Sequence, residues 1–328
     1  MTLLALTEAL RQGRGLLLKR DIQPFARAFP HAPSSPRLGP RSGEPIRNGD
    51  DAAAIPDGDG HLLLAAEGML PGFVAAAPWF AGYCAILVNA SDIAAMGGRP
   101  YAVVDVIFAG DGLDLEQLLA GMRVASEQLA IPVVGGHTSH IAGETALAVA
   151  IVGRARSLIT SFDAHPEQDL LLAIDLRGAY HGRGNNFDAA TEAPAEGLRA
   201  QLEVLPEIAE AGLVRAGKDV SMAGIPGTLV MLAESSGCGA VLDLDAISRP
   251  ADVPLERWLQ TFPSFGYLLA ADRDHTPEII ARFDAVGVAC ARVGRFCAER
   301  AVSLTLGGEQ SIFWDLQQAP LTSFSKEA

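Results

Sequence analysis

Residues 48–100 carry three segments on which the rest of the chain depends: NGDDAAAI (48–55), LLLAAEGMLPGF (62–73) and GYCAILVNASDIAAMGGRP (82–100). In each segment carboxylates stand at the edge of an apolar run, where a strand or helix ends and a polar group can point into a cleft. These carboxylates are Asp50, Asp51, Glu67 and Asp92. Magnesium takes hard oxygen ligands, so acids that converge from separate segments predict a magnesium site.

The composition is that of a globular protein with room for two domains. The chain has 328 residues, of which 49% are hydrophobic, and such a length is most naturally divided into domains of roughly 150 residues. The net charge of −14 argues against a nucleic-acid or anionic-membrane partner, because phosphate backbones favour clustered Lys and Arg. An acidic protein can still bind nucleotide when a divalent metal neutralises the phosphates.

The cysteines and the amino terminus indicate a cytoplasmic protein. The four cysteines have no CxxC spacing, which favours reduced thiols: Cys84, Cys238, Cys290 and Cys297. Cys290 and Cys297 could meet, but buried bystanders are the better interpretation. The start MTLLALTEALRQGRG has no signal-peptide pattern, and no apolar run approaches the ~20 residues that span a bilayer.

Hydrophobic periodicity predicts an α+β fold in which helices cover one face of a sheet. Helices are expected at Leu3–Gln12, Ile22–Phe29, Trp79–Ala95 and Leu113–Leu129, and strands at His61–Ala66, Tyr101–Ala109 and Thr145–Val152. The segment Pro30–Arg47 is rich in Pro, Gly, Ser and Arg, which predicts a loop. PVVGG (132–136) is expected to end a short strand in two glycines, which either approach a phosphate or make a plain turn.

A domain boundary is expected near Gly153–Pro166, which gives domains 1–155 and 156–328. The second block is predicted to contain strands at Asp169–Leu176, Gly266–Asp272 and Val302–Leu306 and a helix at Glu196–Ala211. Between them lies a glycine-rich loop, RGAYHGRGNNFDAAT (177–191), whose dense hydrogen-bond donors suit a substrate pocket or an ordinary surface loop.

The chain resembles a known superfamily in the order and spacing of five segments. They are NGDDAAAI, the carboxylate of Glu67 after an apolar strand, VNASDIAAMGGRP, VVGGHT followed by ALAVAIVG, and KDVSMAGIPGTLVMLAESSGCGAVLDLDAI. This superfamily contains aminoimidazole ribonucleotide synthetase, thiamine-monophosphate kinase, selenophosphate synthetase and the hydrogenase-maturation factor HypE. The resemblance covers roughly residues 45–310. The chain looks most like the AIR synthase-related members whose substrate is not assigned.

The resemblance implies a two-domain PurM-like fold, a homodimer formed through the N-terminal domains, and a cleft that binds ATP with Mg²⁺. Carried over position by position, the implied metal ligands are Asp51, Glu67, Asp92 and Asp219. The implied nucleotide-binding residues are Asp51, Asn89, Gly135, Gly136 and His137. Lys218 and His137 are the predicted catalytic residues: Lys218 is fixed near the metals by its neighbour Asp219 and would stabilise substrate or transition-state charge, and His137 would contact phosphate or substrate.

Alternatives to these roles remain open for single residues. Any one acid could be a helix cap or a solvated turn residue, Lys218 could face solvent, and His137 could be a buried histidine with satisfied hydrogen bonds. The chain also departs from named members: it reads GGHT (135–138) where thiamine-phosphate kinases have GGD, and FPSFGYLL (262–269) where they have GEDYELL. It lacks the N-terminal catalytic Cys of selenophosphate synthetases. Selenium activation and thiamine-phosphate phosphorylation are therefore disfavoured.

The sequence thus predicts an enzyme that uses ATP and Mg²⁺ to transfer a phosphoryl group to a small molecule, or to activate that molecule through a transient phosphate. In such chemistry the metals neutralise the triphosphate and positioning supplies most of the rate. The alternative is a nucleotide-binding accessory or scaffold protein with impaired catalysis. The loss of the GGD acid favours this alternative, whereas Asp51, Asp92 and Asp219 argue against it.

Overall fold

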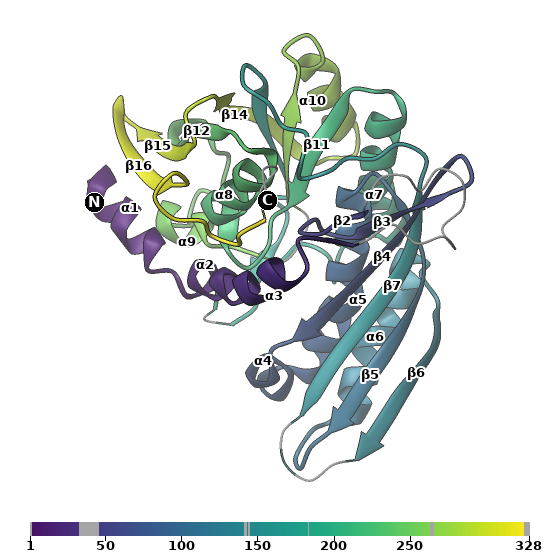
Figure 1. Cartoon of the computed structure of the whole chain (residues 1–328). Helices are drawn as coiled ribbons and strands as arrows, with labels where there is room; N and C mark the ends of the chain where they lie inside the picture. The colour runs from purple at the N-terminus through teal and green to yellow at the C-terminus, as the bar shows by residue number, and fades with distance from the viewer. Residues whose placement is uncertain are drawn as a thin grey trace.

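Two β-sheets and the helices that cover them make up the computed structural model (Figure 1). It describes residues 2–32, 46–140, 143, 145–182, 184–262 and 266–324. Most of the predicted loop Pro30–Arg47 lies outside the described residues. The α+β prediction is confirmed, because each sheet carries its helices on faces that bury apolar side chains.

The first sheet has five strands in the order β3-β4-β7-β5-β6. Their bounds are β3 (Ala53–Asp57), β4 (Gly60–Met69), β5 (Arg99–Ala109), β6 (Val133–His140) and β7 (Ala146–Ala155). All pairings are antiparallel except that of β5 with β6. Helices α4 (Pro71–Ala76), α5 (Pro78–Ala95) and α6 (Leu115–Leu129) accompany it.

The second sheet has seven strands in the order β11-β13-β8-β14-β12-β15-β16. The strand bounds are β8 (Asp169–Ile174), β11 (Val214–Asp219), β12 (Gly239–Asp243), β13 (Gly266–Ala271), β14 (Ala289–Cys297), β15 (Ala301–Leu306) and β16 (Glu309–Asp315). Its helices are α7 (Ala195–Glu210), α8 (Gly224–Ser236), the 3₁₀ helix η2 (Leu244–Ala246), α9 (Leu255–Leu259) and α10 (Thr276–Ala285). Two-residue strands form small separate pairs: β1 (His31–Ala32) with β2 (Ile46–Arg47), and β9 (Ala179–Tyr180) with β10 (Phe187–Asp188).

The position of β8 between two cores explains why its sequence, DLLLAI, is apolar without alternation. Leu171 and Ala173 point into the core shared with the first sheet, whereas Leu170, Leu172 and Ile174 point into the second core. A strand that is buried on both faces reads as a continuous apolar run. The first core is therefore continuous from the first sheet, through α5 and α7, to one face of the second sheet.

The amino-terminal helices pack on the second sheet, which differs from the predicted domain 1–155. They are α1 (Leu3–Arg11), α2 (Arg14–Leu18), the 3₁₀ helix η1 (Lys19–Ile22) and α3 (Gln23–Ala28). Leu6 and Leu10 enter the second core, and the Arg11 guanidinium donates to the carbonyls of Ile312 (2.6 Å) and Phe313 (3.0 Å) on β16. Helical periodicity shows which face of a helix is buried, but not which core buries it.

The predicted helices and strands agree with the structure to within a few residues, with β6 as the main difference. Its two glycines lie inside an eight-residue strand and do not end it. Strands β11, β12, β14 and β16 were not resolved from the sequence. None of the four cysteines, all of which the structure describes, forms a disulfide, and Cys84, Cys238 and Cys290 are buried. Among the described residues no helix has the length and apolar character needed to cross a membrane.

Candidate functional site

A cavity of about 700 Å³ lies where the two sheets meet. Its walls come from the loop before β3, the strand β4, the helix α5 and the end of β11. The cavity also receives side chains from η1 and α3 and from residues 322 and 324 near the carboxyl terminus. Segments far apart in the sequence thus meet in one hollow.

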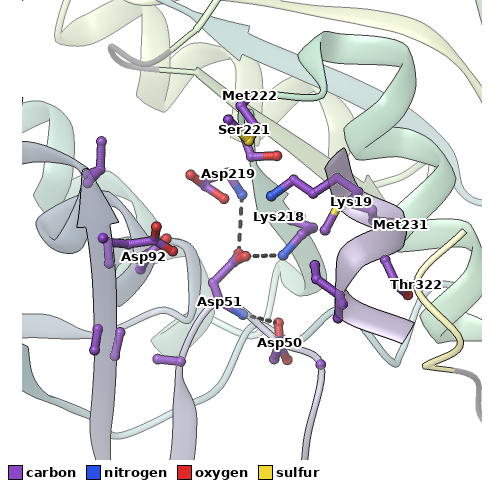
Figure 2. A pocket seen from close by; sticks show the side chains of 18 of the residues that line it. Lys19, Asp50, Asp51, Asp92, Lys218, Asp219, Ser221, Met222, Met231 and Thr322 are labelled. Atoms are coloured by element: carbon purple, nitrogen blue, oxygen red, sulfur yellow. Dashed lines mark hydrogen bonds and ion pairs between the residues drawn. The ribbon is translucent and has the colours of Figure 1, made fainter. Parts of the chain in front are cut away.

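Three acids converge in this cavity. Asp51, Asp92 and Asp219 each offer a carboxylate oxygen, and these three oxygens lie within 4.8 Å of one another. Figure 2 shows the three side chains turned toward a common space from different elements. Asp51 precedes β3, Asp92 lies on α5, and Asp219 ends β11. This spacing suits a divalent cation that bridges carboxylates.

Lys218 holds Asp51 in place. Its ammonium group donates to Asp51 Oδ1, and the backbone N–H of Asp219 donates to Asp51 Oδ2 at 3.3 Å (Figure 2). Lys218 is only 4% exposed, so the alternative of a solvent-facing lysine is wrong. Burial alone would lower the pKa of Lys218, but the surrounding charges of Asp51, Asp219 and Asp50 raise it above its usual value. Lys218 therefore stays charged.

The environment of the acids opposes their ionisation. Burial, followed by the charge of Asp51, raises the pKa of Asp219 to about 8. Burial, followed by the charges of Asp219 and Glu67, holds the pKa of Asp92 well above its usual range. Like charges held this close are costly without a compensating cation, so the cluster favours a bound cation.

Asp50 has a different task from its neighbour Asp51. Its carboxylate accepts hydrogen bonds from the Ser161 N–H (2.9 Å) and the Ser161 hydroxyl (2.7 Å). Burial, followed by the charge of Asp51, raises the pKa of Asp50 to about 6. Its Oδ1 also accepts a hydrogen bond from the Asp51 N–H at 3.0 Å (Figure 2). Through these bonds to Ser161, Asp50 anchors the loop that carries Asp51 to the connection between the two sheets.

Two buried polar atoms at the cavity suit a bound cation. Among the described residues, Asp92 Oδ2 and Ser221 Oγ have no hydrogen-bond partner. Both residues line the cavity, and Asp92 is 6% exposed. A buried carboxylate oxygen without a donor is costly unless it meets a cation. The residues present therefore fit the Mg²⁺ that the sequence predicts.

Glu67 and Lys19 also line this cavity. Glu67 lies on β4, is more exposed than the three acids, and does not belong to the group within 4.8 Å. Lys19 lies on η1 and points toward Asp219 (Figure 2). Burial, followed by the charge of Lys218, lowers the pKa of Lys19. Neither Lys19 nor Ser221 was among the site residues predicted from the sequence.

Asn89, one of the predicted nucleotide-binding residues, does not line the cavity. It is fully buried in α5, and its Nδ2 donates to the Ala85 carbonyl at 2.8 Å within the same helix. Its side chain therefore bonds to its own helix. We leave it out of the proposed site.

The structure likewise does not bring Gly135, Gly136 and His137 to this cavity. All three lie on β6, at an edge of the first sheet, and are exposed, so the alternative of a buried histidine is wrong. His137 Nε2 lies 3.0 Å from Ser139 Oγ. A Cβ atom at Gly136 would lie 2.4 Å from Asp105 Oδ2, which gives this glycine a packing reason. Their nucleotide and catalytic roles stay predictions.

The family of the chain is now clear from comparison with known proteins. The family described as AIR synthase related protein matches with its N-terminal domain over residues 49–155 and with its C-terminal domain over residues 171–307. The chain belongs to this family. It is 48% identical to an uncharacterised protein of Synechocystis sp., over 97% of this chain and 98% of that one.

Solved structures share the fold. PurL of T. maritima complexed with FGAR has a TM-score of 0.73 at 16% identity, over 98% of this chain. The same protein complexed with ATP has a TM-score of 0.66, and AaThiL complexed with AMPPCP and TMP has 0.62 at 18% identity over 91% of its chain. This chain spans about half of PurL, 54% and 45% in the two complexes. These likenesses confirm the predicted PurM-like two-domain fold.

Proposed function

We propose that this protein is an enzyme that uses ATP and Mg²⁺ to transfer a phosphoryl group to a small-molecule acceptor. The observation that carries the proposal is the buried group of Asp51, Asp92 and Asp219, fixed by Lys218 in a cavity of about 700 Å³. Three rigidly held carboxylates beside a charged lysine match what a metal-bound triphosphate requires. The related proteins solved with ATP and with AMPPCP support nucleotide as the phosphate source.

The residues that line the cavity have different roles in this proposal. Asp51, Asp92 and Asp219 would hold Mg²⁺ and thereby orient the nucleotide phosphates, and Glu67 extends the acidic wall. Bound Mg²⁺ neutralises the triphosphate and polarises the phosphoryl group that is transferred. Lys218 holds Asp51 in position through their ion pair, so the metal site is preorganised before the substrate arrives. The surrounding apolar side chains exclude water from the phosphoryl group.

The related structures hold nucleotides and other small molecules. T. maritima PurL is solved with ATP and, in a separate structure, with FGAR, and AaThiL is solved with AMPPCP and TMP. We expect the segments that the family shares, 49–155 and 171–307, to bind nucleotide. The acceptor is then expected against segments outside those ranges. A scaffold protein without catalysis is the second function that the sequence left open; the rigid placement of Lys218 and the three acids favours the enzyme.

Magnesium with ATP is expected to raise the melting temperature. Binding to the folded state alone stabilises it by about 2.7 kcal/mol at 100 times Kd, which is a shift of a few degrees. Differential scanning fluorimetry with Mg-ATP, with ATP plus EDTA and with Mg²⁺ alone measures this, and release of phosphate or ADP in the same mixtures reports turnover. No shift with saturating Mg-ATP would contradict the nucleotide site. A shift without turnover, in the presence of candidate acceptors, would favour the scaffold.

We also propose a homodimer formed through the uncovered face of the first sheet. Helices α5 and α6 pack on one face of this sheet, and among the described residues nothing covers the other (Figure 1). That face exposes Leu64 (48%) on β4 and Val104 (43%) and Val106 (40%) on β5, the two strands that flank β7. Exposed apolar side chains grouped on one sheet face are typical of an interaction surface. His137 lies beside Val106 and would become part of the interface.

Replacing Val106 by Lys is expected to convert the dimer to a folded monomer, because a buried unpaired charge at the centre of an interface costs several kcal/mol. Light scattering measures the mass of both forms. Leu119→Lys serves as the control, because Leu119 is comparably exposed (44%) but lies on α6. A parent protein that is monomeric at micromolar concentration would overturn the proposal, as would equal effects of the two substitutions.

A further inference from the structure

The two ends of the chain form one wall of the cavity. Lys19, Ile22 and Phe25 come from the amino-terminal helices, and Thr322 and Phe324 come from the carboxyl end. The rings of Phe25 and Phe324 meet edge to face, with centroids 6.5 Å apart. None of these residues falls in the ranges that match the family, 49–155 and 171–307. The wall therefore lies outside the two segments that match the family.

Specific contacts hold this wall in place on the second domain. A Cβ atom at Gly15 would lie only 1.8 Å from the Met222 carbonyl oxygen, so α2 rests on that backbone directly. Gln23 Nε2 donates to the carbonyls of Pro320 (3.2 Å) and Leu321 (3.1 Å), which joins the two ends of the chain.

The carboxyl end has its own anchor in Glu234 of α8. Its buried carboxylate accepts hydrogen bonds from the N–H groups of Leu321 (3.1 Å), Thr322 (2.8 Å) and Ser323 (3.0 Å), and from the Thr322 hydroxyl (2.8 Å). Hydrogen bonds to a buried charge are among the stronger ones in proteins. A side chain on this wall therefore has a defined position relative to the three acids.

Lys19 is the cation that this wall presents to the cavity. No acid among the described residues lies within 4.0 Å of its ammonium group, in contrast to Lys218, whose charge is used by Asp51. Figure 2 shows the Lys19 side chain extending toward Asp219, across from Asp92. A partly buried ammonium group without an ion-pair partner, beside a cluster of acids that suits a metal, is placed to meet an anion bound between the two.

We propose that Lys19 is a further catalytic residue, which binds the phosphoryl group in transit from the side of the acceptor. This inference rests on the proposed function. The metal-binding acids approach the phosphoryl group from the family core, whereas Lys19 approaches it from the terminal wall, against which the acceptor lies. The apolar side chains of Ile22, Phe25 and Phe324 beside Lys19 suit an acceptor with an apolar body.

The step balances without any further reactant. The acceptor oxygen forms a bond to the γ-phosphorus of ATP while the bond from that phosphorus to the β–γ bridging oxygen breaks. The bridging oxygen keeps the electron pair and leaves as part of ADP, and any proton on the acceptor oxygen passes to water. Lys19 keeps its proton throughout and donates to the equatorial oxygens, on which negative charge is spread in the transition state.

The test uses Mg-ADP with and without fluoroaluminate, which mimics the phosphoryl group in transit and requires no acceptor. In calorimetry, Lys19→Met and Lys19→Gln are expected to bind Mg-ADP as the parent does. Both should bind Mg-ADP–fluoroaluminate about ten- to a hundredfold more weakly than the parent, because one hydrogen bond to a charged group is lost. Lys19→Arg is expected to retain part of the affinity. Arg20→Met is the matched control, because Arg20 is the exposed neighbour of Lys19 on η1 and does not line the cavity.

The results distinguish a failure of the proposed function from a failure of the role assigned to Lys19. A parent that fails to bind Mg-ADP removes the proposed function and this inference with it. If Lys19→Met and Lys19→Gln weaken Mg-ADP as much as the mimic, or leave the mimic unaffected, Lys19 does not contact the transferred group, and the proposed function still stands. An equal loss in Arg20→Met would mean a long-range charge effect and would overturn the assignment. Lowered affinity for the mimic alone, in both Lys19 variants, supports it.

Discussion

Asp92→Asn is expected to abolish magnesium-dependent nucleotide binding while the metal-free protein keeps its stability. Asp92 is buried in α5, and burial together with the charges of Asp219 and Glu67 holds its pKa well above the usual range. Burial and the neighbouring acids thus oppose the negative charge of Asp92 when no metal is bound, and asparagine keeps the shape of the side chain without that charge. A metal ligand must be anionic here, so the substitution removes what Mg²⁺ needs and little of what the fold needs.

Calorimetry with Mg-ATP and a thermal melt without metal measure the two halves of this prediction. Affinity should fall at least a hundredfold, about 2.7 kcal/mol, whereas the metal-free melting temperature should stay within a few degrees. Asp111→Asn, an exposed acid of the same domain, is the control for loss of net charge. Parent-like Mg-ATP binding by Asp92→Asn would show that Asp92 is structural and that the proposed metal site is wrong.

The pH dependence of stability provides a second test of the Asp92→Asn variant. A carboxyl group whose pKa is raised on folding binds more protons in the folded state, so its contribution to stability falls as pH rises. The pKa of Asp219 is raised to about 8, and the unfolded value is near 4, so the metal-free parent should lose stability between those pH values. Asp92→Asn removes one raised pKa from the cluster and should make this loss shallower.

The sequence predicted Asp51 and Asp92 because each stands at the edge of an apolar segment, whereas Asp219 was implied by the resemblance to the superfamily. Any one of these acids has an ordinary structural explanation, but the order of their segments argues for a common role of the set. The spatial meeting of the three then follows from the two-domain fold that the segments imply.

Lys19 and the residues of β6 show where such prediction fails. The position of Lys19 depends on the close approach of Gly15 to Met222, over two hundred residues away in the chain, which local periodicity cannot reveal. The glycine pair Gly135–Gly136 fits a phosphate-binding turn and an edge strand equally well. The room that Gly136 leaves for Asp105 depends on the parallel register of β5 and β6, which the sequence does not specify.

Lys218→Met is expected to destabilise the metal-free protein by about 3–5 kcal/mol, the cost of leaving a buried charge without its partner. The side chains of Lys218 and Asp51 are 5% and 4% exposed, so water cannot replace the lost ammonium group. The variant Asp51→Asn/Lys218→Met removes both charges and should recover much of this loss. Denaturant unfolding of the parent, both single variants and the double variant gives the coupling energy.

Added Mg²⁺ tests whether the lost charge of Lys218 explains the lower stability of Lys218→Met. If Lys218 stabilises the fold by compensating the acids, a divalent cation in the same cluster should replace it, and Mg²⁺ should raise the melting temperature of Lys218→Met more than that of the parent. Calcium, which prefers more ligands at longer distances, should do so less well in a site built from three carboxylates. A Lys218→Met protein that is destabilised as expected but insensitive to Mg²⁺ would mean that no divalent cation binds among the three acids, and the carboxylate cluster would lose its proposed role.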